Sequence, residues 1–567
     1  MKTVSLTLFF LLAGLPGSSL GASRAPVRGR HGMVASVSGI ASRIGTDVMK
    51  KGGNAVDAAV AVGLALEVVW PSAGNIGGGG FMLIRFPDGK SIAIDYRERA
   101  PLAATRTMYL DENGKVIEGA STLGYQGVGV PGTVAGFALA NRKYGKLPWK
   151  ELIEPAVRLA RDGFVIDHDL AGSLNAKENV RRLGKFAESR RIFLRNGKPY
   201  EEGEIFRQPE LAATLERIRD EGAGDFYEGK TAKLIVDAMK QNGGLITARD
   251  LATYEPTERE PLRGSYRGYD IITMPPPSSG GIVLTEMLNM LSHYDLRTLG
   301  RNSAASIHLL TEVMRRAYAD RASYLGDTDF VQGVPVEGLM SPAYAAELVK
   351  GIDLTRATRS SEIGNPKPQR YESPDTTHYS VVDGAGTVVS NTYTLNSAYG
   401  SAVTVKGGGF LLNNEMDDFT SKPGVPNEYG LIQGEANSIA PRKRPLSSMT
   451  PTIVLKNGEF RFAVGSPGGS TIINTVLQVI LNVVDYGMDI QQAVDAPRVH
   501  HQWMPDEIRW EPYGLNADTR AILVKMGHHI REKPGYIGDA EAVGIDPTDG
   551  MLLGASDPRG GGEPAGY

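Results

Sequence analysis

The chain has 567 residues, of which 41% are hydrophobic, and its 61 Lys plus Arg against 64 Asp plus Glu give a formal net charge of -3. This composition predicts a compact globular protein and excludes extended disorder, while the small charge gives no electrostatic reason to expect a nucleic-acid or anionic-membrane partner. Cysteine is absent, which excludes disulfides, a thiolate nucleophile and Cys-ligated metals. No repeat, charge block or long linker divides the chain, so we expect one large intertwined unit that acts on a small soluble partner.

The first 22 residues have the pattern of a signal peptide. Lys2 is followed by an apolar run over residues 4–13 and then by small residues up to Ala22. The run is too short to span a bilayer, and an ordinary N-terminal helix is disfavoured because no polar face balances it. We therefore predict a signal peptide over residues 1–22, a periplasmic or secreted location, and no membrane span after its removal.

A glycine-rich run at residues 74–80 invites comparison with a nucleotide-binding loop. It follows predicted helices at residues 41–50 and 54–69 and leads into a predicted strand at residues 81–86. A phosphate-binding glycine loop instead follows a strand and opens a helix. We therefore reject a dinucleotide site and expect these glycines to allow close backbone packing.

The middle of the chain is predicted to be scaffold. Charged amphipathic helices are expected at residues 154–162 and 231–241, with no recognisable chemistry. Residues 274–281, rich in Pro and Ser, precede a predicted core helix at residues 282–291 and are interpreted as an ordered loop. Their serines lack the Gly-x-Ser-x-Gly context of a hydrolase nucleophile, so a serine hydrolase is disfavoured.

Several charged or titratable residues have a structural interpretation when they are taken alone. Arg97, at the end of a predicted strand, is typical of an ion-pair residue. The adjacent histidines at 500–501 and 528–529 diverge along a strand and are expected to be structural. A long helix over residues 307–325 is predicted to carry a solvated, paired face made of Glu312, Arg315, Arg316 and Asp320.

A hairpin is predicted where a polar segment, residues 351–372, gives way to β-branched residues. A strand starts at Thr376, residues 383–386 have turn composition, and residues 387–394 form the returning strand. An even-numbered turn there pairs Thr376 with Tyr393, so Thr394 lies on the opposite face unless a bulge intervenes. Threonine-rich hairpins are usually only hairpins, and these residues alone leave open whether the two hydroxyl groups are catalytic.

Residues 409–419 gather three carboxylates, which fit either a metal site or an acidic turn. Histidines at ligand spacing are missing from the stretch, so we expect no metal site there.

The chain resembles the γ-glutamyltranspeptidase family at a series of motifs in family order. Asp375-Thr376-Thr377-His378-Tyr379-Ser380 is similar to the family's processing site. The likeness covers nearly all of the chain after the signal peptide and implies an α+β N-terminal-nucleophile hydrolase fold, a four-layer αββα sandwich that needs no cofactor and no metal. The later motifs that match are Thr394, Asn396, residues 416–419, residues 445–449 and residues 465–469.

The resemblance implies that the chain cuts itself between Asp375 and Thr376. A large subunit (23–375) and a small catalytic subunit (376–567) would stay together as a heterodimer. The Thr376 hydroxyl would attack the Asp375 carbonyl, and hydrolysis of the resulting ester would free the Thr376 α-amine. An α-amine has an unperturbed pKa of roughly 7.7 to 8.0, so it can accept the hydroxyl proton near neutral pH.

The resemblance also implies a role for each matched residue. Thr376 would attack the γ-amide and Thr394 would hold the nucleophile, while the N–H groups of Gly468 and Gly469 would stabilise the oxyanion. Residues 422–434 resemble the family's lid loop. The substrate α-carboxylate would bind Arg97, Ser447 and Ser448, and its α-ammonium would bind Asn396, Glu415 and Asp418, where the family has either Gln or Glu at the position of Glu415.

The expected activity is therefore γ-glutamyl transfer or hydrolysis on glutathione and related γ-glutamyl compounds, with water, an amino acid or a peptide as acceptor. Two alternatives stay open. A glutaryl-type cephalosporin acylase of the same fold is disfavoured because a glutaryl group has no ammonium for Glu415 and Asp418 to pair. An unprocessed exported binding protein is disfavoured by the Asp375-Thr376 junction.

Overall fold

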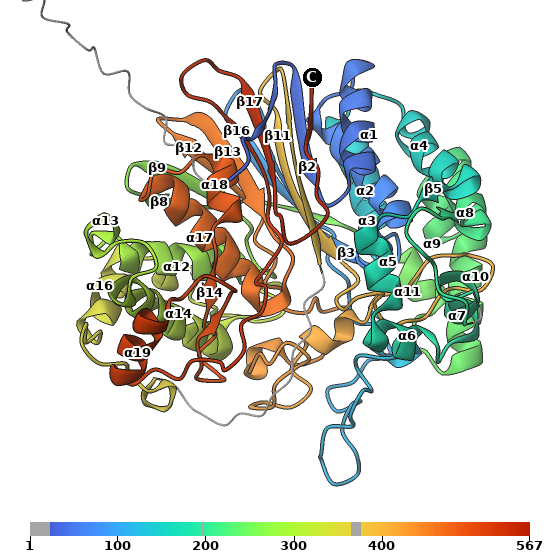
Figure 1. Cartoon of the computed structure of the whole chain (residues 1–567). Coiled ribbons are helices and arrows are strands. Elements are labelled where there is room, and N and C mark those ends of the chain that lie inside the picture. The colour runs from blue at the N-terminus through green and yellow to red at the C-terminus, as the bar shows by residue number, and fades with distance from the viewer. Residues whose placement is uncertain (1–22, 196, 364–375) are drawn as a thin grey trace, which may run out of the picture.

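The computed structural model describes residues 23–195, 197–363 and 376–567, so the predicted signal peptide and Asp375 lie outside the described residues. Two seven-stranded antiparallel sheets face each other, with helices on both outer sides (Figure 1). The first sheet has the order β1 (Val27–Gly29), β17 (Leu552–Ser556), β16 (Glu541–Ile545), β13 (Glu459–Gly465), β12 (Thr452–Lys456), β9 (Tyr269–Thr273) and β8 (Leu262–Tyr266). The second has the order β18 (Ala565–Gly566), β2 (Gly32–Ser36), β10 (Thr377–Asp383), β11 (Val388–Thr394), β3 (Gly79–Arg85), β4 (Ser91–Asp95) and β7 (Thr257–Arg259).

The helices divide into two layers, one over each sheet (Figure 1). The layer over the second sheet contains α1 (Gly39–Lys50), α2 (Ala55–Val69), α3 (Thr133–Tyr144), α4 (Trp149–Asp162), α5 (His168–Asn175), α6 (Lys177–Leu183), α7 (Ala187–Phe193), α8 (Pro209–Glu221), α9 (Gly224–Tyr227), α10 (Lys230–Asn242) and α11 (Ala248–Ala252). The other layer contains α12 (Gly280–Leu291), α13 (Leu296–Leu299), α14 (Ala304–Tyr324), α15 (Val336–Leu339), α16 (Pro342–Lys350), α17 (Ile472–Val484), α18 (Ile490–Asp495) and α19 (Ala517–Lys525). Two small ribbons lie outside the two large sheets: β5 (Phe164–Val165) with β6 (Ile205–Phe206), and β14 (Val499–His500) with β15 (Arg509–Trp510).

Three apolar cores hold the four layers together. A central core between the sheets packs Phe81 and Leu83 of β3 against Ile453 of β12 and Val543 of β16. Larger cores lie between each sheet and its helices. Of the helices in the described part of the chain, none combines the length and apolarity that a membrane span requires. The predicted four-layer αββα arrangement is confirmed.

The glycine run before β3 serves backbone packing, as predicted. A Cβ atom at Gly77 would lie 2.0 Å from the Leu411 carbonyl oxygen, and one at Gly78 would lie 2.1 Å from that of Thr394. Side chains at these positions would push apart the strand ends, so only glycine fits. The run thus lets the chain pass directly beside the end of β11.

The register of the β10–β11 hairpin differs from the prediction. Val382 pairs with Val388 and Thr377 with Tyr393, which continues to place Thr376 opposite Thr394 instead of Tyr393. The reason is that the loop spans residues 384–386, with Gly386 at φ 89°, and Asp383 itself pairs with Thr387. An odd, three-residue loop with glycine in the left-handed position shifts the pairing by one residue. No bulge is needed to bring the two threonines together.

The charged face predicted on the long helix is buried, which corrects the prediction of a solvated face. In α14, Glu312 lies between Arg315 and Arg316, and all three are less than a tenth exposed. The Glu312 carboxylate also accepts a hydrogen bond from the Thr358 N–H. Helical spacing fixes which residues share a face but not whether another segment covers it, and here residues 351–363 do so. Asp320 is partly exposed and accepts a hydrogen bond from Tyr344.

Replacing Glu312 with Ala should destabilise the protein by about 3 to 5 kcal/mol, because two buried guanidinium groups lose their common partner. The exposed Glu347–Lys350 pair, with side chains 67% and 68% exposed, offers a matched control. Glu347→Ala should change the stability by less than about 1 kcal/mol. Urea unfolding followed by circular dichroism measures both variants, and equal losses would contradict the buried network.

Candidate active site

Two threonine hydroxyl groups meet where β10 begins and β11 ends. Thr376 is 8% exposed, and its Oγ1 donates a hydrogen bond to Oγ1 of Thr394 over 3.3 Å. The Thr394 oxygen also accepts from the Asn396 N–H at 2.8 Å. Asn396 has a φ of 78°, so the chain turns sharply as it leaves β11. The Thr376 oxygen is thereby held at the end of a buried strand pair.

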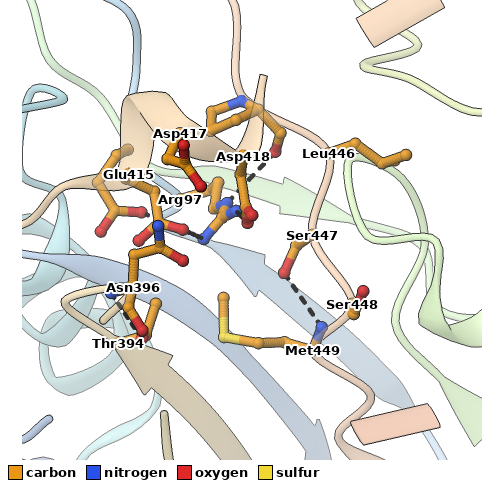
Figure 2. Close-up of polar contacts among 12 residues, drawn as sticks. Arg97, Thr394, Asn396, Glu415, Asp417, Asp418, Leu446, Ser447, Ser448 and Met449 are labelled. Atoms are coloured by element: carbon orange, nitrogen blue, oxygen red, sulfur yellow. Dashed lines mark hydrogen bonds and ion pairs between the residues drawn. The ribbon is translucent and has the colours of Figure 1, made fainter. Parts of the chain in front are cut away.

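These threonines open into a pocket that collects nearly all of the predicted site residues. Figure 2 shows Arg97, Glu415 and Asp418 on one side of the pocket and Ser447 and Ser448 on another. Gly469 is part of the pocket lining, but Gly468, which directly precedes it, is not. Asp375 lies outside the described residues. The lining consists of Arg97, Thr376, Thr394, Asn396, Glu415, Asp418, Tyr429, Leu431, Ser447, Ser448, Met449, Gly469 and Ile472.

The charged side of the pocket is centred on Arg97, which follows β4. Its Nη1 lies 2.5 Å from Glu415 Oε1, and its Nη2 lies 2.5 Å from Asp418 Oδ2. Burial would lower the pKa of Arg97, but Glu415 and Asp418 outweigh it and raise that pKa. The guanidinium occupies the space between the two carboxylates that a metal ion would need. Arg97 is therefore already paired with both acids that were predicted to bind the ammonium.

A third acid, Glu98, belongs to this cluster and was missed by the sequence analysis. It is fully buried, with one carboxylate oxygen 3.6 Å from Arg97 Nη1. Burial raises the pKa of Glu98 to about 7, although Arg97 opposes the shift. Its position next to Arg97 was the available signal, but adjacent charges in a sequence do not reveal that both are buried.

The backbone around Gly468 and Gly469 is arranged to leave N–H groups available. The two glycines follow β13 with φ values of 130° and 52°, a region that favours glycine. The Gly468 carbonyl accepts hydrogen bonds from the N–H and hydroxyl of Thr471. Within the described ranges, neither glycine N–H donates a hydrogen bond to the protein. Gly469 lines the same pocket as Thr376, and the oxyanion role of the two N–H groups stays a prediction.

The loop over residues 422–434 covers the pocket. The Tyr429 hydroxyl donates to the Asn396 carbonyl at 2.6 Å, and Asn427 donates to Asp418 at 3.1 Å. The Tyr429 ring lies so close to Gly469 that a Cβ there would be 2.4 Å away. The remaining cavity is about 20 Å³, which is room for roughly one water molecule. A cavity of this size holds no organic substrate unless part of its lining moves.

A separate cluster has metal-binding spacing among the described residues: His308, Glu312 and His528. The two imidazoles are hydrogen-bonded to each other at 2.7 Å, and Glu312 is held by Arg315 and Arg316. The other ring nitrogen of His528, Nδ1, is buried and has no hydrogen-bond partner in the described chain, and a structural role for His528 stays a prediction. The acidic residues around Arg97 do not form such a cluster in the described part of the chain.

The fold and the threonine at the head of a strand define an N-terminal-nucleophile hydrolase, and solved structures of this class superpose on the chain. A cephalosporin acylase from Bacillus halodurans has a TM-score of 0.84 and 28% identity, and the match covers 98% of this chain and 99% of that one. Helicobacter pylori gamma-glutamyltranspeptidase has a TM-score of 0.56 and 47% identity over 59% of this chain and 96% of that one.

The sequence comparisons then give the family. The gamma-glutamyltranspeptidase family model matches residues 41–567. The glutathione hydrolase proenzyme of Escherichia coli (strain K12) is 49% identical over 534 residues, which are 94% of this chain and 91% of the relative. The chain belongs to the gamma-glutamyltranspeptidase family.

The buried carboxyl of Glu98 should make stability depend on pH. A carboxyl whose pKa rises from 4.5 to about 7 on folding stabilises the protein below pH 4.5 and loses that contribution as the pH rises through 7. Glu98→Gln keeps a neutral group at every pH. The stability of the wild type relative to Glu98→Gln should therefore fall between pH 4.5 and 7, by an amount on the order of 3 kcal/mol.

Urea unfolding of both proteins at several pH values measures this difference. A difference that stays constant or grows with pH would contradict the assignment of a raised pKa to Glu98.

Proposed function

We propose that the chain is a self-processing γ-glutamyl transferase and hydrolase that cleaves the γ-glutamyl amide of glutathione and related compounds. The observation that carries this proposal is the Thr376–Thr394 hydroxyl pair beside a pocket lined by one buried cation, Arg97, and two buried acids, Glu415 and Asp418. Membership of the gamma-glutamyltranspeptidase family supports the same activity. Export to the periplasm or the medium stays a prediction from residues 1–22.

Processing would begin with attack of the Thr376 hydroxyl on the carbonyl of Asp375. The peptide bond becomes an ester, and water hydrolyses it to leave a carboxylate on Asp375 and a free α-amine on Thr376. The products would be a large subunit (23–375) and a small subunit (376–567). In the second sheet, β10 pairs with β2 and β11 pairs with β3. Both partners would belong to the large subunit, so the cut fragments would stay together as a heterodimer.

Donor binding would rearrange the charges around Arg97. The donor's α-carboxylate would bind Arg97, Ser447 and Ser448, while its α-ammonium would bind Asn396, Glu415 and Asp418. Glu415 and Asp418 each contact Arg97 now, so the ammonium would share acids that the arginine already holds. A γ-linked amide places its carbonyl at Thr376 only when both charged ends are bound, which accounts for γ-specificity.

Acyl transfer would take place in two steps. The Thr376 oxygen attacks the γ-carbonyl, its proton passes to the α-amine, and the Gly468 and Gly469 N–H groups stabilise the oxyanion. The leaving amine takes the proton, and a γ-glutamyl ester of Thr376 remains. Water, or the amine of an amino-acid or peptide acceptor, then attacks the ester and restores the Thr376 hydroxyl. Opening of the loop at residues 422–434 would admit the donor.

Two other functions fit the pocket less well. A glutaryl acylase needs no partner for an ammonium group, whereas this pocket contains Glu415 and Asp418. An unprocessed binding protein gives no reason for the Thr376–Thr394 contact at the end of a strand pair.

Thr376→Ala should give a folded but uncut and inactive chain, because the hydroxyl is required for both processing and acyl transfer. Thr376→Ser should process slowly, since the lost methyl no longer restricts the rotamer, and imperfect orientation can cost about a hundredfold in rate. Denaturing gels and turnover of a γ-glutamyl anilide measure the two effects. The neighbouring Thr377, which is buried in β10 outside the pocket lining, gives a control: Thr377→Ser should process and turn over like the wild type. Cleavage or near-normal turnover in Thr376→Ala would mean that another residue is the nucleophile.

The pocket's acids should favour a γ-glutamyl donor over a glutaryl donor that lacks the ammonium. Glu415→Gln keeps the shape but removes one charge, so the ratio of kcat/KM for γ-glutamyl anilide to that for glutaryl anilide should fall about tenfold. Steady-state kinetics on both anilides give the ratio. A wild-type preference for glutaryl anilide would favour the acylase alternative.

A further inference from the structure

One buried arginine beside the pocket has no acidic partner. Arg321 on α14 is 2% exposed, and no carboxylate of the described chain forms an ion pair with it. Its Nη2 donates to Ser448 Oγ at 3.1 Å, its Nε donates to Ser279 Oγ at 2.9 Å, and its Nη1 lies 3.4 Å from Gln433 Oε1. A buried cation without an anion is costly unless a ligand supplies the opposite charge.

The loop before α12 builds a frame around the same serines. The Ser279 N–H and hydroxyl both donate to the Ser447 carbonyl, and Ser447 N–H donates to the Pro277 carbonyl. Ser278 donates its hydroxyl to the Met449 carbonyl. Because the single hydroxyl proton of Ser279 is used, its oxygen can only accept from Arg321. The Pro/Ser stretch of the sequence thus connects Arg321 to the backbone at residues 447–449.

These bonds determine how the Ser448 hydroxyl is oriented. Its oxygen accepts a hydrogen bond from Arg321, so its own proton points elsewhere, and Ser448 lines the pocket. A hydroxyl held in this way can donate a hydrogen bond to a carboxylate in the pocket. The positive charge bound to its oxygen strengthens that hydrogen bond.

Arg97 is already engaged by other groups of the protein. It contacts the carboxyl groups of Glu415, Asp418 and Glu98, and burial raises the pKa of Glu415 and of Glu98. A carboxylate approaching this cluster meets a partly neutralised guanidinium. Burial lowers the pKa of Arg321 to about 10, against smaller opposing effects of Tyr318 and Asp418, so Arg321 stays protonated at neutral pH.

We propose that Arg321 is a positioning residue for the donor's α-carboxylate: it orients the Ser448 hydroxyl towards the pocket and supplies the positive charge that Arg97 lacks. The inference rests on the proposed γ-glutamyl function. Arg321 acts through Ser448 and Ser279 and need not touch the donor.

Three anilide donors separate this role from a purely structural one. The γ-glutamyl anilide has both charged groups, the glutaryl anilide has only the carboxylate, and the 4-aminobutanoyl anilide has only the ammonium. In Arg321→Met, KM for the two carboxylate donors should rise about tenfold or more, with kcat within about twofold. For the 4-aminobutanoyl anilide, kcat/KM should stay within about twofold of the wild type.

Arg301→Met is the matched control. Arg301 is a partly buried arginine without an ion pair in the described chain, held by the Asn482 side chain and the Pro497 carbonyl. Its replacement should leave the ratios of kcat/KM among the three anilide donors unchanged. If Arg321→Met does not fold, Arg321→Lys decides, because it keeps the charge but loses the fork that holds both serines. It should raise KM for the carboxylate donors several-fold and leave kcat/KM for the 4-aminobutanoyl anilide within about twofold.

If the Arg321 variants lose kcat/KM equally on all three anilides, or if their kinetics are unchanged on all three, the proposed role of Arg321 is overturned. Failure of the wild type to cleave γ-glutamyl anilide would instead overturn the proposed function, so the two failures are distinct.

Discussion

The pairing of β10 with β11 is the constraint on which the rest of the site depends. One hairpin loop of three residues sets a register in which Thr376 faces Thr394, and a shift of one residue would turn every side chain of the strand to the other sheet face. The flanking strands β2 and β3 and the glycine run beside Thr394 hold that register from both sides. A nucleophile held at the end of such a strand pair has little orientational freedom left to lose when it reaches the transition state. Acyl transfer is faster when the reacting atoms are oriented in advance in this way.

A second constraint is that buried charge must be balanced. In the described part of the chain, Arg97 contacts three buried carboxyl groups, whereas the buried Arg321 forms no ion pair. A buried guanidinium without an anion is costly away from water. A zwitterion would place its ammonium among the carboxyl groups and its carboxylate on the side of Ser448 and Arg321. Specificity for a γ-glutamyl group would then follow from the charge pattern of the protein itself.

Much of the fold was predictable because it is local. Helices α2 and α12, the strand after the glycine run and both strands of the hairpin follow from hydrophobic pattern and turn residues, and the resemblance supplied the four-layer arrangement. The hairpin register was wrong because the loop length could not be read from turn composition. The burial of Glu312, Glu98 and Arg321 was missed because it depends on segments far away in the sequence. Tertiary contacts decide whether a charged helix face is solvated, and no local pattern records them.

We expect Thr376 to become the N-terminal residue of a catalytic fragment. N-terminal sequencing of the smaller fragment from purified, active protein tests it most directly. We expect a single sequence that begins Thr376-Thr377-His378-Tyr379. A fragment that begins at another residue, or active material that consists of one uncut chain, would contradict it.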